Sequence, residues 1–304
     1  MRPIIDYIKH PASLCDSLVR HFCQWLPDSL YLKLRYRFQM GKRLNLSCPC
    51  TFQEKLQWLK IHDHNPLYTT MVDKILVKDY VSSKIGSHYI IPLLGIWDRP
   101  EDIEWEKLPS RFVLKTNHSG GNTGVVICKN KTTFDYNNAI KKLNASLKAD
   151  VYRDLREWPY KNVSKKIFAE EYIEITPTET SLTDYKWYCF NGEPKFCQVI
   201  QDRSTNETID FFDTEWQHLD FVGLNPLANN SSVPHKCPEN LKKQIEIARK
   251  LSEGIPFSRI DLYESGIGTL FGEITFYPAS GIGSFRPDKY DRLLGEMLDI
   301  SELM

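Results

Sequence analysis

The chain has 304 residues, enough for one large domain or two ordinary ones, and 41% of them are apolar, so it can bury a core of its own. Basic and acidic residues number 39 each, so the net charge is zero and does not favour nucleic acid as a partner. No apolar run approaches the ~20 residues of a membrane span and the N-terminus lacks the features of a signal peptide, so we expect a cytoplasmic protein.

The first 65 residues are predicted to form a helical region. Leu14, Leu18, Phe22 and Leu26 recur at the spacing of one helical stripe, and "LYLKLRYRFQMGKRL" continues with apolar residues among basic ones. A stripe of this width is more often a packing face than a membrane-binding face, so we expect it to pack against the rest of the protein. Association with the inner face of the membrane is the alternative.

Two further helices are predicted from their start signals. Thr51 and Glu54 form a T-x-x-E capping box ahead of "FQEKLQWLKIH". Thr70 and Asp73 precede a second apolar stripe that is expected to end at Gly86.

A glycine-rich stretch, "HSGGNTG" at residues 118–124, lies between two β-rich runs, "RFVLKTN" and "GVVICK". It lacks the lysine and the following helix of a Walker loop, and it does not open a helix as a dinucleotide fingerprint does. We therefore predict a hairpin loop that joins two strands. Such a loop is either a plain turn or a cover that closes over a ligand.

The second half of the chain predicts mostly antiparallel strands. "DYKWYCFNGEPKFCQVIQ" is expected to form two strands about the turn Asn191-Gly192. Helices are predicted around residues 137–147 and over "ENLKKQIEIARKLSEG", and "SRIDLY" and "TLFGEITFYP" are expected to form a final pair of strands. Helices mixed with antiparallel pairs indicate an α+β fold rather than a doubly wound sheet.

The final strand pair carries charged residues on one face. Alternation places Arg259 with Asp261 and Glu273 with Thr275 on that face, while the opposite face is apolar. If the strands pair, two carboxylates face each other and require a cation or a proton between them. Mg2+ suits such oxygen ligands, since it takes one or two carboxylates with water and phosphate oxygens. The alternative is an ordinary salt bridge of Arg259 to either acid.

Four separate blocks occur in order along the chain: "TFQEKLQWLK", "LPSRFVLKTNHSGG", "DYKWYCFNGEPKF" and "GEITFYPASG". Together they resemble the TupA-like ATP-grasp family, which is linked to bacterial cell-surface polysaccharides, from about Leu30 to near the C-terminus. The resemblance implies an ATP-grasp fold, in which two α+β subdomains clasp ATP, behind an N-terminal helical extension. The implied divisions are a helical region at 1–65, a small α/β part at 66–110, and an ATP-grasp domain at 111–304 that divides after residue 171.

The resemblance also assigns roles to residues, with ATP and Mg2+ as cofactors. The residues implied to bind ATP are Lys115, Ser119, Gly120, Gly121, Asn122, Gly124, Glu171, Tyr172, Ile173, Glu174 and Lys186. Among them, Glu171 and Ile173 would meet the adenine edge through their backbone groups, and Glu174 the ribose; a solvated strand end is the alternative. Arg259 and Lys186 are implied as catalytic, and the metal ligands as Asp261, Glu273 and Thr275. Many superfamily members have asparagine where this chain has Thr275, which puts a second metal in doubt.

The function implied is that of an ATP-dependent carboxylate-amine ligase, which forms an acyl phosphate and joins an amine to a uronic acid of a surface glycan or its precursor. His118, Arg203 and Arg286 are suggested to hold the anionic acceptor, with structural roles as the alternative. Two other functions stay open. A glycosyltransferase of the same pathway is opposed by the lack of a D-x-D motif, and a non-catalytic nucleotide-binding protein draws support from Thr275.

Overall fold

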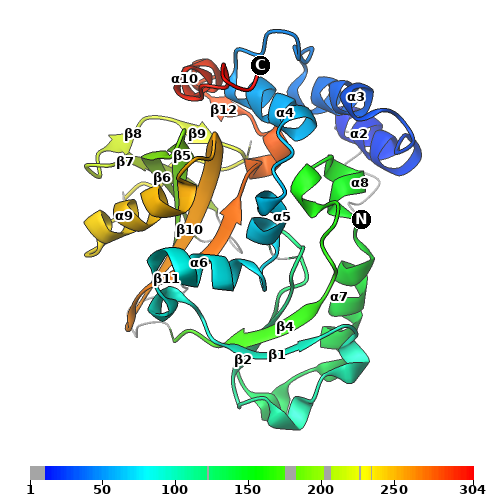
Figure 1. The fold of residues 1–304 in the computed structure, drawn as a ribbon, viewed down its shortest axis with the longest axis vertical. Helices are drawn as coiled ribbons and strands as arrows, with labels where there is room; N and C mark the ends of the chain where they lie inside the picture. Colours follow the sequence, from blue (N-terminus) through cyan, green and yellow to red (C-terminus); the bar gives the residue numbers. More distant parts are fainter. Residues whose placement is uncertain (1–10, 122, 175–182, 202–206, 226, 234) are drawn as a thin grey trace.

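Two antiparallel sheets form the framework of the computed structural model, which describes residues 11–304 except 122, 175–182, 202–206, 226 and 234 (Figure 1). A four-stranded sheet has the order β1-β4-β2-β3, a six-stranded sheet the order β11-β10-β5-β6-β7-β8, and β12 pairs with β9. The strands are β1 Leu93–Trp97, β2 Phe112–Thr116, β3 Val126–Cys128, β4 Ile167–Glu171, β5 Asp184–Phe190, β6 Glu193–Gln201, β7 Thr208–Asp213, β8 His218–Leu219, β9 Val222–Gly223, β10 Phe257–Ser265, β11 Gly268–Thr275 and β12 Phe285–Arg286. The α+β class is confirmed.

Helices cover the sheets and form the N-terminal region. The predicted capping box is present: the Thr51 side chain accepts a hydrogen bond from the N–H of Glu54, and the Glu54 side chain accepts one from the N–H of Thr51. The α-helices are α2 Pro11–Phe22, α3 Asp28–Met40, α4 Phe52–His62, α5 Leu67–Val72, α6 Val77–Ile85, α7 Tyr136–Lys148, α8 Val151–Leu155, α9 Leu241–Ser252 and α10 Lys289–Met297. Short 3-10 helices lie at Ser87–Tyr89, Pro100–Asp102, Trp105–Lys107, Lys131–Thr133, Trp158–Tyr160 and Pro278–Gly281. No helix among the described residues is both long and apolar enough to cross a membrane.

The predicted hairpins are present. The glycine stretch joins β2 to β3, which pair antiparallel, and Asn191-Gly192 joins β5 to β6 with both residues at positive φ. The strand β1 pairs with β4, so the sheet that carries the glycine stretch reaches back into residues 66–110.

The second predicted helix start was wrong, because Asp73 ends a helix instead of beginning one. The chain breaks there into α5 and α6, and Asp73 Oδ1 accepts hydrogen bonds from the N–H groups of Ile75 and Leu76. An aspartate that binds the backbone two and three residues ahead stabilises a turn as readily as a helix start. This turn brings Lys74 to the functional site described below.

The main core lies against the six-stranded sheet, and the apolar face predicted for β10 and β11 belongs to it: Ile260, Leu262, Ile274 and Phe276 are all buried. A smaller core fills the four-stranded sheet around Phe112. The charged face of β10 and β11 is therefore fixed toward the other sheet by burial of the opposite face.

Of the predicted N-terminal stripe, only Leu26 packs as expected, against the small core around Tyr31. In α2 the side chains of Leu14, Leu18 and Phe22 are 42%, 47% and 72% exposed. The helix turns Asp16 and Val19 toward α3 instead, where Asp16 forms a buried ion pair with Arg35 at 2.7 Å. Leu14 and Leu18 each stand about 200° around the helix from Asp16, so this pair directs the stripe outward.

Candidate functional site

A cavity of about 470 Å³ lies between the two sheets. The four-stranded sheet and its glycine stretch contribute Lys115, Gly121 and Val125, and the α5–α6 turn contributes Lys74. The six-stranded sheet contributes the charged face of its strands. The charged lining residues on its strands are Asp184, Lys186, Arg259, Asp261 and Glu273, and Glu207 lies just before β7.

The two predicted carboxylates face each other in this cavity. Asp261 on β10 is directly opposite Glu273 on β11, and on its other side it is opposite Lys186 on β5. Arg259 Nε donates to Asp261 Oδ1 at 2.6 Å, and its Nη2 reaches Glu273 Oε1 at 3.1 Å. Lys186 Nζ contacts Asp261 Oδ2 and lies 2.5 Å from Asp184 Oδ2. Cations therefore separate carboxylates that would otherwise repel.

Burial and charge act in opposite directions on the two acids. Burial raises the pKa of Asp261 above its ordinary value, although Arg259 and Lys186 oppose the rise. Burial also acts to raise the pKa of Glu273, but Lys74, Arg259 and Lys186 outweigh it and hold that pKa far below the ordinary range. The site thus keeps Glu273 ionised at any physiological pH.

The donor set fits Mg2+ only in part. Asp261 and Glu273 supply two hard carboxylates, and Thr275 Oγ1 lies 3.0 Å from Glu273 Oε1 as a weaker third oxygen. Among the described residues there is no group of three or more His, Cys, Asp or Glu side chains arranged for a metal. Two carboxylates suit magnesium when phosphate and water oxygens complete its shell. Metal binding here would therefore depend on a bound nucleotide.

The glycine stretch is tied to this acid pair by Lys74, which the sequence analysis missed. Lys74 Nζ donates to the carbonyl of Ser119 at 2.7 Å and lies 3.2 Å from Glu273 Oε2. At Gly124, φ is +71°, and an added Cβ would lie 2.5 Å from Thr116 Oγ1. Gly120 has open space around it and an ordinary φ. The glycine at 124 is thus needed by the fold, whereas the fold leaves room for a Cβ at 120.

Lys115 is held in place by a buried carboxylate that the sequence analysis did not single out as a site residue. Glu170 Oε2 lies 2.5 Å from Lys115 Nζ, and Glu170 Oε1 lies 2.6 Å from Lys78 Nζ. Burial acts to raise the pKa of Glu170, yet Lys115 and Lys78 together lower it. Glu170 therefore positions Lys115 at the cavity.

The predicted adenine side lies at the end of β4. The N–H of Glu171 donates to the carbonyl of Pro92 at 3.1 Å, and Glu174 is exposed and paired with Arg111 at 2.7 Å. Tyr172 stacks near the same arginine. None of residues 171–174 lines the described cavity, and Asn122 falls outside the described residues, so these nucleotide assignments stay predictions.

Of the suggested acceptor residues, His118 and Arg286 are described, and neither lines the cavity. His118 is 2% exposed, and its Nε2 lies 3.2 Å from the carbonyl of Ser146. Arg286 is exposed and donates to the carbonyl of Ala228. Arg203 is outside the described residues. The proposed role of these residues in holding an acceptor stays a prediction.

A loop beside the acid pair is held by one face of α4. Ala279, which lines the cavity, and Ser280 both have positive φ, 46° and 54°. Gln57 Nε2 donates to the carbonyl of Gly281 at 2.6 Å, and Lys60 Nζ donates to the carbonyl and the hydroxyl of Ser280 at 2.9 Å each. Gln53 binds Gly283 in the same way. The spacing of these polar residues on one buried helical face was the signal the sequence offered.

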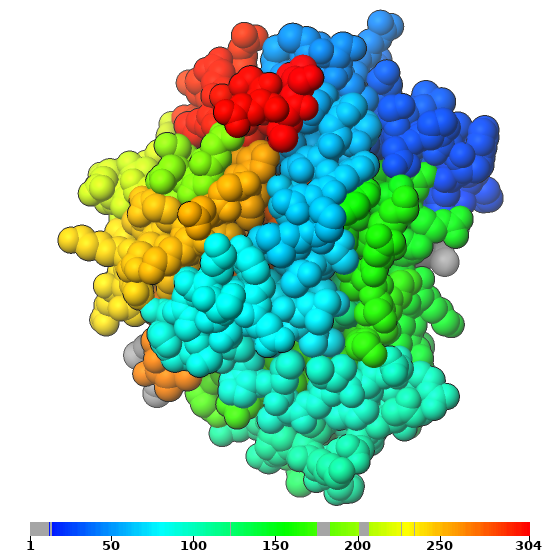
Figure 2. All heavy atoms as spheres, in the orientation of Figure 1, coloured from blue at the N-terminus to red at the C-terminus, as the bar shows by residue number. Residues whose placement is uncertain are grey.

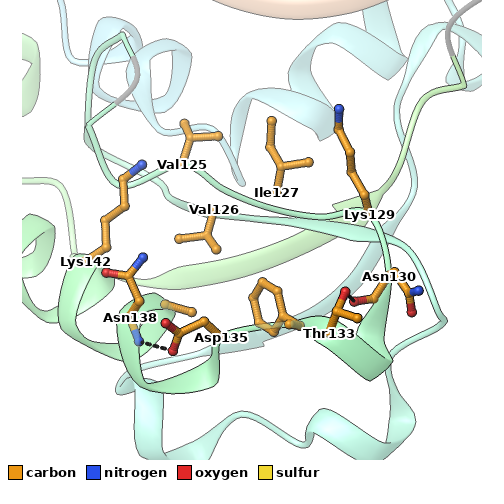
Figure 3. A pocket seen from close by; sticks show the side chains of 11 residues that line it. Val125, Val126, Ile127, Lys129, Asn130, Thr133, Asp135, Asn138 and Lys142 are labelled. Carbon is orange, nitrogen blue, oxygen red and sulfur yellow. Dashed lines mark hydrogen bonds between the residues drawn. The ribbon is translucent and has the colours of Figure 1, made fainter.

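A second hollow of about 670 Å³ lies on the outer side of β3, against α7 (Figure 3). Lys129 and Lys142 lie at opposite ends of it, and its floor includes Val126. Val125 lines both hollows. This hollow has no pair of carboxylates, so the chemistry is assigned to the cavity between the sheets.

Two sheets that hold a glycine stretch and an opposed acid pair across one cavity define a protein with the ATP-grasp fold. The family model described as TupA-like ATPgrasp matches residues 54–299. The chain belongs to this family, and the resemblance seen in the sequence is confirmed.

Solved structures with a similar chain path include two D-alanine–D-alanine ligases. The enzyme from Coxiella burnetii has a TM-score of 0.44 and 16% identity, over 85% of this chain and 70% of that chain. The enzyme from Bacillus anthracis has a TM-score of 0.43 and 16% identity, over 75% of this chain and 66% of that chain, just under two thirds of its length. The ATP-grasp ligase PsnB with its minimal precursor has a TM-score of 0.38 and 12% identity, over 73% and 58%. No curated protein matches the chain.

Proposed function

We propose that this protein is an ATP-dependent carboxylate-amine ligase of bacterial cell-surface polysaccharide biosynthesis, which joins an amino acid or another amine to a uronic acid in the cytoplasm. The observation that carries the proposal is the opposition of Asp261 and Glu273 across one ladder, in the cavity that the glycine stretch borders. Four cations line the same cavity: Lys74, Lys115, Lys186 and Arg259. Membership of the ATP-grasp family supports ATP as the nucleotide.

The proposed reaction has two steps. In the first, a carboxylate oxygen of the acceptor attacks the γ-phosphorus of ATP. The bond from that phosphorus to the bridging oxygen breaks, ADP departs, and an acyl phosphate is formed. The amine nitrogen then attacks the acyl carbon, the bond from that carbon to the phosphate oxygen breaks, and the nitrogen loses its proton as the amide forms.

The cations have a defined part in the first step. Arg259 and Lys186 meet at Asp261, where both can face the oxygens of a transferring phosphoryl group and stabilise its charge. Lys115, fixed by Glu170, is proposed to bind a second phosphate. Mg2+, when held by Asp261 and Glu273, would neutralise phosphate charge at the same place.

The glycine stretch is proposed to protect the reaction from water. The backbone N–H groups of residues 119–124 are proposed to cover the phosphates and to exclude water, which would otherwise hydrolyse the acyl phosphate. Gly121 lines the cavity and has open space around it, so a phosphate could approach the backbone there. The tie from Lys74 to Ser119 couples this cover to Glu273.

The test is ADP release with ATP, Mg2+ and a panel of uronic acids and amino acids. Asp261→Asn and Glu273→Gln are compared with Glu264→Gln, an acid on β10 that instead binds Gln244 and Thr269 outside the cavity. We expect release to require both a carboxylate and an amine, to fall at least ~100-fold in the two site variants, and to persist in the control. Turnover of a nucleotide sugar without any such requirement would identify a glycosyltransferase. ATP bound but never cleaved would identify a non-catalytic protein.

A further inference from the structure

The outer face of α2 is apolar and open in the described structure. Leu18, Phe22 and Trp25 are 47%, 72% and 80% exposed, and Leu14 continues the row. We call these four residues the α2 stripe. Leu14, Leu18 and Phe22 are four residues apart on one helical face, so they form a row instead of scattered single residues. Trp25 lies in the turn that follows, three residues after the helix ends at Phe22.

The stripe cannot turn inward at low cost. Arg35 donates to both carboxylate oxygens of Asp16, at 2.7 and 3.1 Å, and to the carbonyl of Asp154 at 3.0 Å. Both members of the ion pair are buried, and Val19 packs beside them. Rolling α2 would leave buried charges without partners. The buried ion pair therefore keeps the stripe on the outer side of the helix.

The stripe lies on a projecting edge of the molecule, away from the cavity. Figure 1 and Figure 2 show α2 and α3, in dark blue, at the periphery beyond α4. Neither described hollow includes a residue of α2 or α3. A projecting apolar row suits insertion into a soft surface better than it suits a grooved partner.

Positive charge lies on the helix that packs against α2 and on the loop after it. Lys33 and Arg37 of α3 and Arg43 of the loop are exposed, whereas the acids of residues 11–43 are neutralised locally: Asp16 by Arg35 and Asp28 by Arg156 at 2.9 Å. A tryptophan and apolar residues, with cations on the adjacent helix, are the composition that favours the interface of an anionic lipid layer.

We propose that the α2 stripe binds the surface of an anionic membrane, with α2 lying in the plane of the interface and the side chains of Leu14, Leu18, Phe22 and, just beyond the helix, Trp25 inserted. The cations of α3 and its C-terminal loop then lie against lipid phosphates. The helix lies on the membrane and does not cross it. This arrangement places the cavity beside, and not within, the lipid layer.

The experiment is vesicle flotation of the full chain, without nucleotide, so that its outcome does not depend on the proposed reaction. Phosphatidylcholine vesicles are compared with vesicles that also contain phosphatidylglycerol, at low and high salt. The test variant Phe22→Glu with Trp25→Glu is matched by Ile267→Glu with Leu293→Glu, which changes two exposed apolar residues elsewhere by the same charge.

We expect the full chain and the control to float with the anionic vesicles, less at high salt, and the test variant to float at least ~10-fold less. Recovery of the full chain in the soluble fraction with anionic vesicles would overturn the proposal. Equal flotation of the test variant would do the same. A dimer in sedimentation velocity that dissociates only in the test variant, with no flotation, would assign the stripe to self-association instead.

Discussion

Replacing Lys60 by methionine removes the ammonium that fixes the loop beside the acid pair while keeping a side chain of similar length. Lys60 Nζ donates to the carbonyl of Leu155 and to both oxygens of Ser280, at 2.9 Å each. Burial lowers its pKa to about 7, although Glu157 opposes the shift. Its three hydrogen bonds join α4 to Leu155 on one side and to the loop at Ser280 on the other.

The expected loss of stability in Lys60→Met follows from the strained backbone that its hydrogen bonds hold in place. A non-glycine residue in the left-handed region costs ~1–2 kcal/mol, so Ala279 and Ser280 together store about 2–4 kcal/mol that their surroundings must offset. Loss of hydrogen bonds from Lys60 is expected to lower the free energy of unfolding by about 2–4 kcal/mol and to release the loop. The rate of ADP release should fall by a larger factor than the affinity for the nucleotide does.

Lys55→Met is the matched control. Lys55 lies on the same helix and donates to the carbonyls of Gly295 and Leu298, at 2.8 and 2.6 Å, away from the cavity. Urea unfolding measures stability for both variants, and hydrogen exchange of amides 279–283 measures the loop. We expect faster exchange there only in Lys60→Met. Identical exchange in both variants would show that Lys60 does not position the loop.

Three further outcomes are expected. Gly124→Ala should destabilise the protein by at least ~2 kcal/mol in urea unfolding, because its φ is +71° and its Cβ would meet Thr116, while Gly120→Ala should change it by less than ~0.5 kcal/mol; equal effects would contradict this reading of the loop. Burial lowers the pKa of His118 to about 4, so the unfolded chain binds more protons between that value and 6.5, and stability should fall by about 3 kcal/mol as pH drops through this range. A His118→Gln variant that kept the same pH slope would assign it to other groups. Lys74→Met should remove a cation from Glu273 and raise its pKa, which a titration of the carboxyl by NMR would detect; an unchanged value would refute the pairing.

The elements that the sequence predicted well are those set by nearby residues. The capping box at Thr51 and the turn at Asn191 depend on residues within four positions, and both are present. The opposition of Asp261 and Glu273 followed from alternation along two adjacent strands, since burial of the opposite face fixes the register.

The elements that were missed depend on distant partners. The direction of the α2 stripe is set by the pair of Asp16 with Arg35, and a stripe pattern alone does not show which side of a helix faces the core. Glu170 has its role only because β4 lies beside β2 and α6 brings Lys78 to it. Lys74 reaches the cavity because Asp73 makes a turn where the pattern predicted a helix start.

Lys74 joins the two walls of the cavity through two contacts of one side chain. One ammonium holds both the carbonyl of Ser119 and the carboxylate of Glu273. A cation that bound Glu273 would have to compete with the ammonium of Lys74 for that carboxylate. The position of residue 119 beside one sheet and the charge around Glu273 on the other therefore depend on the same side chain.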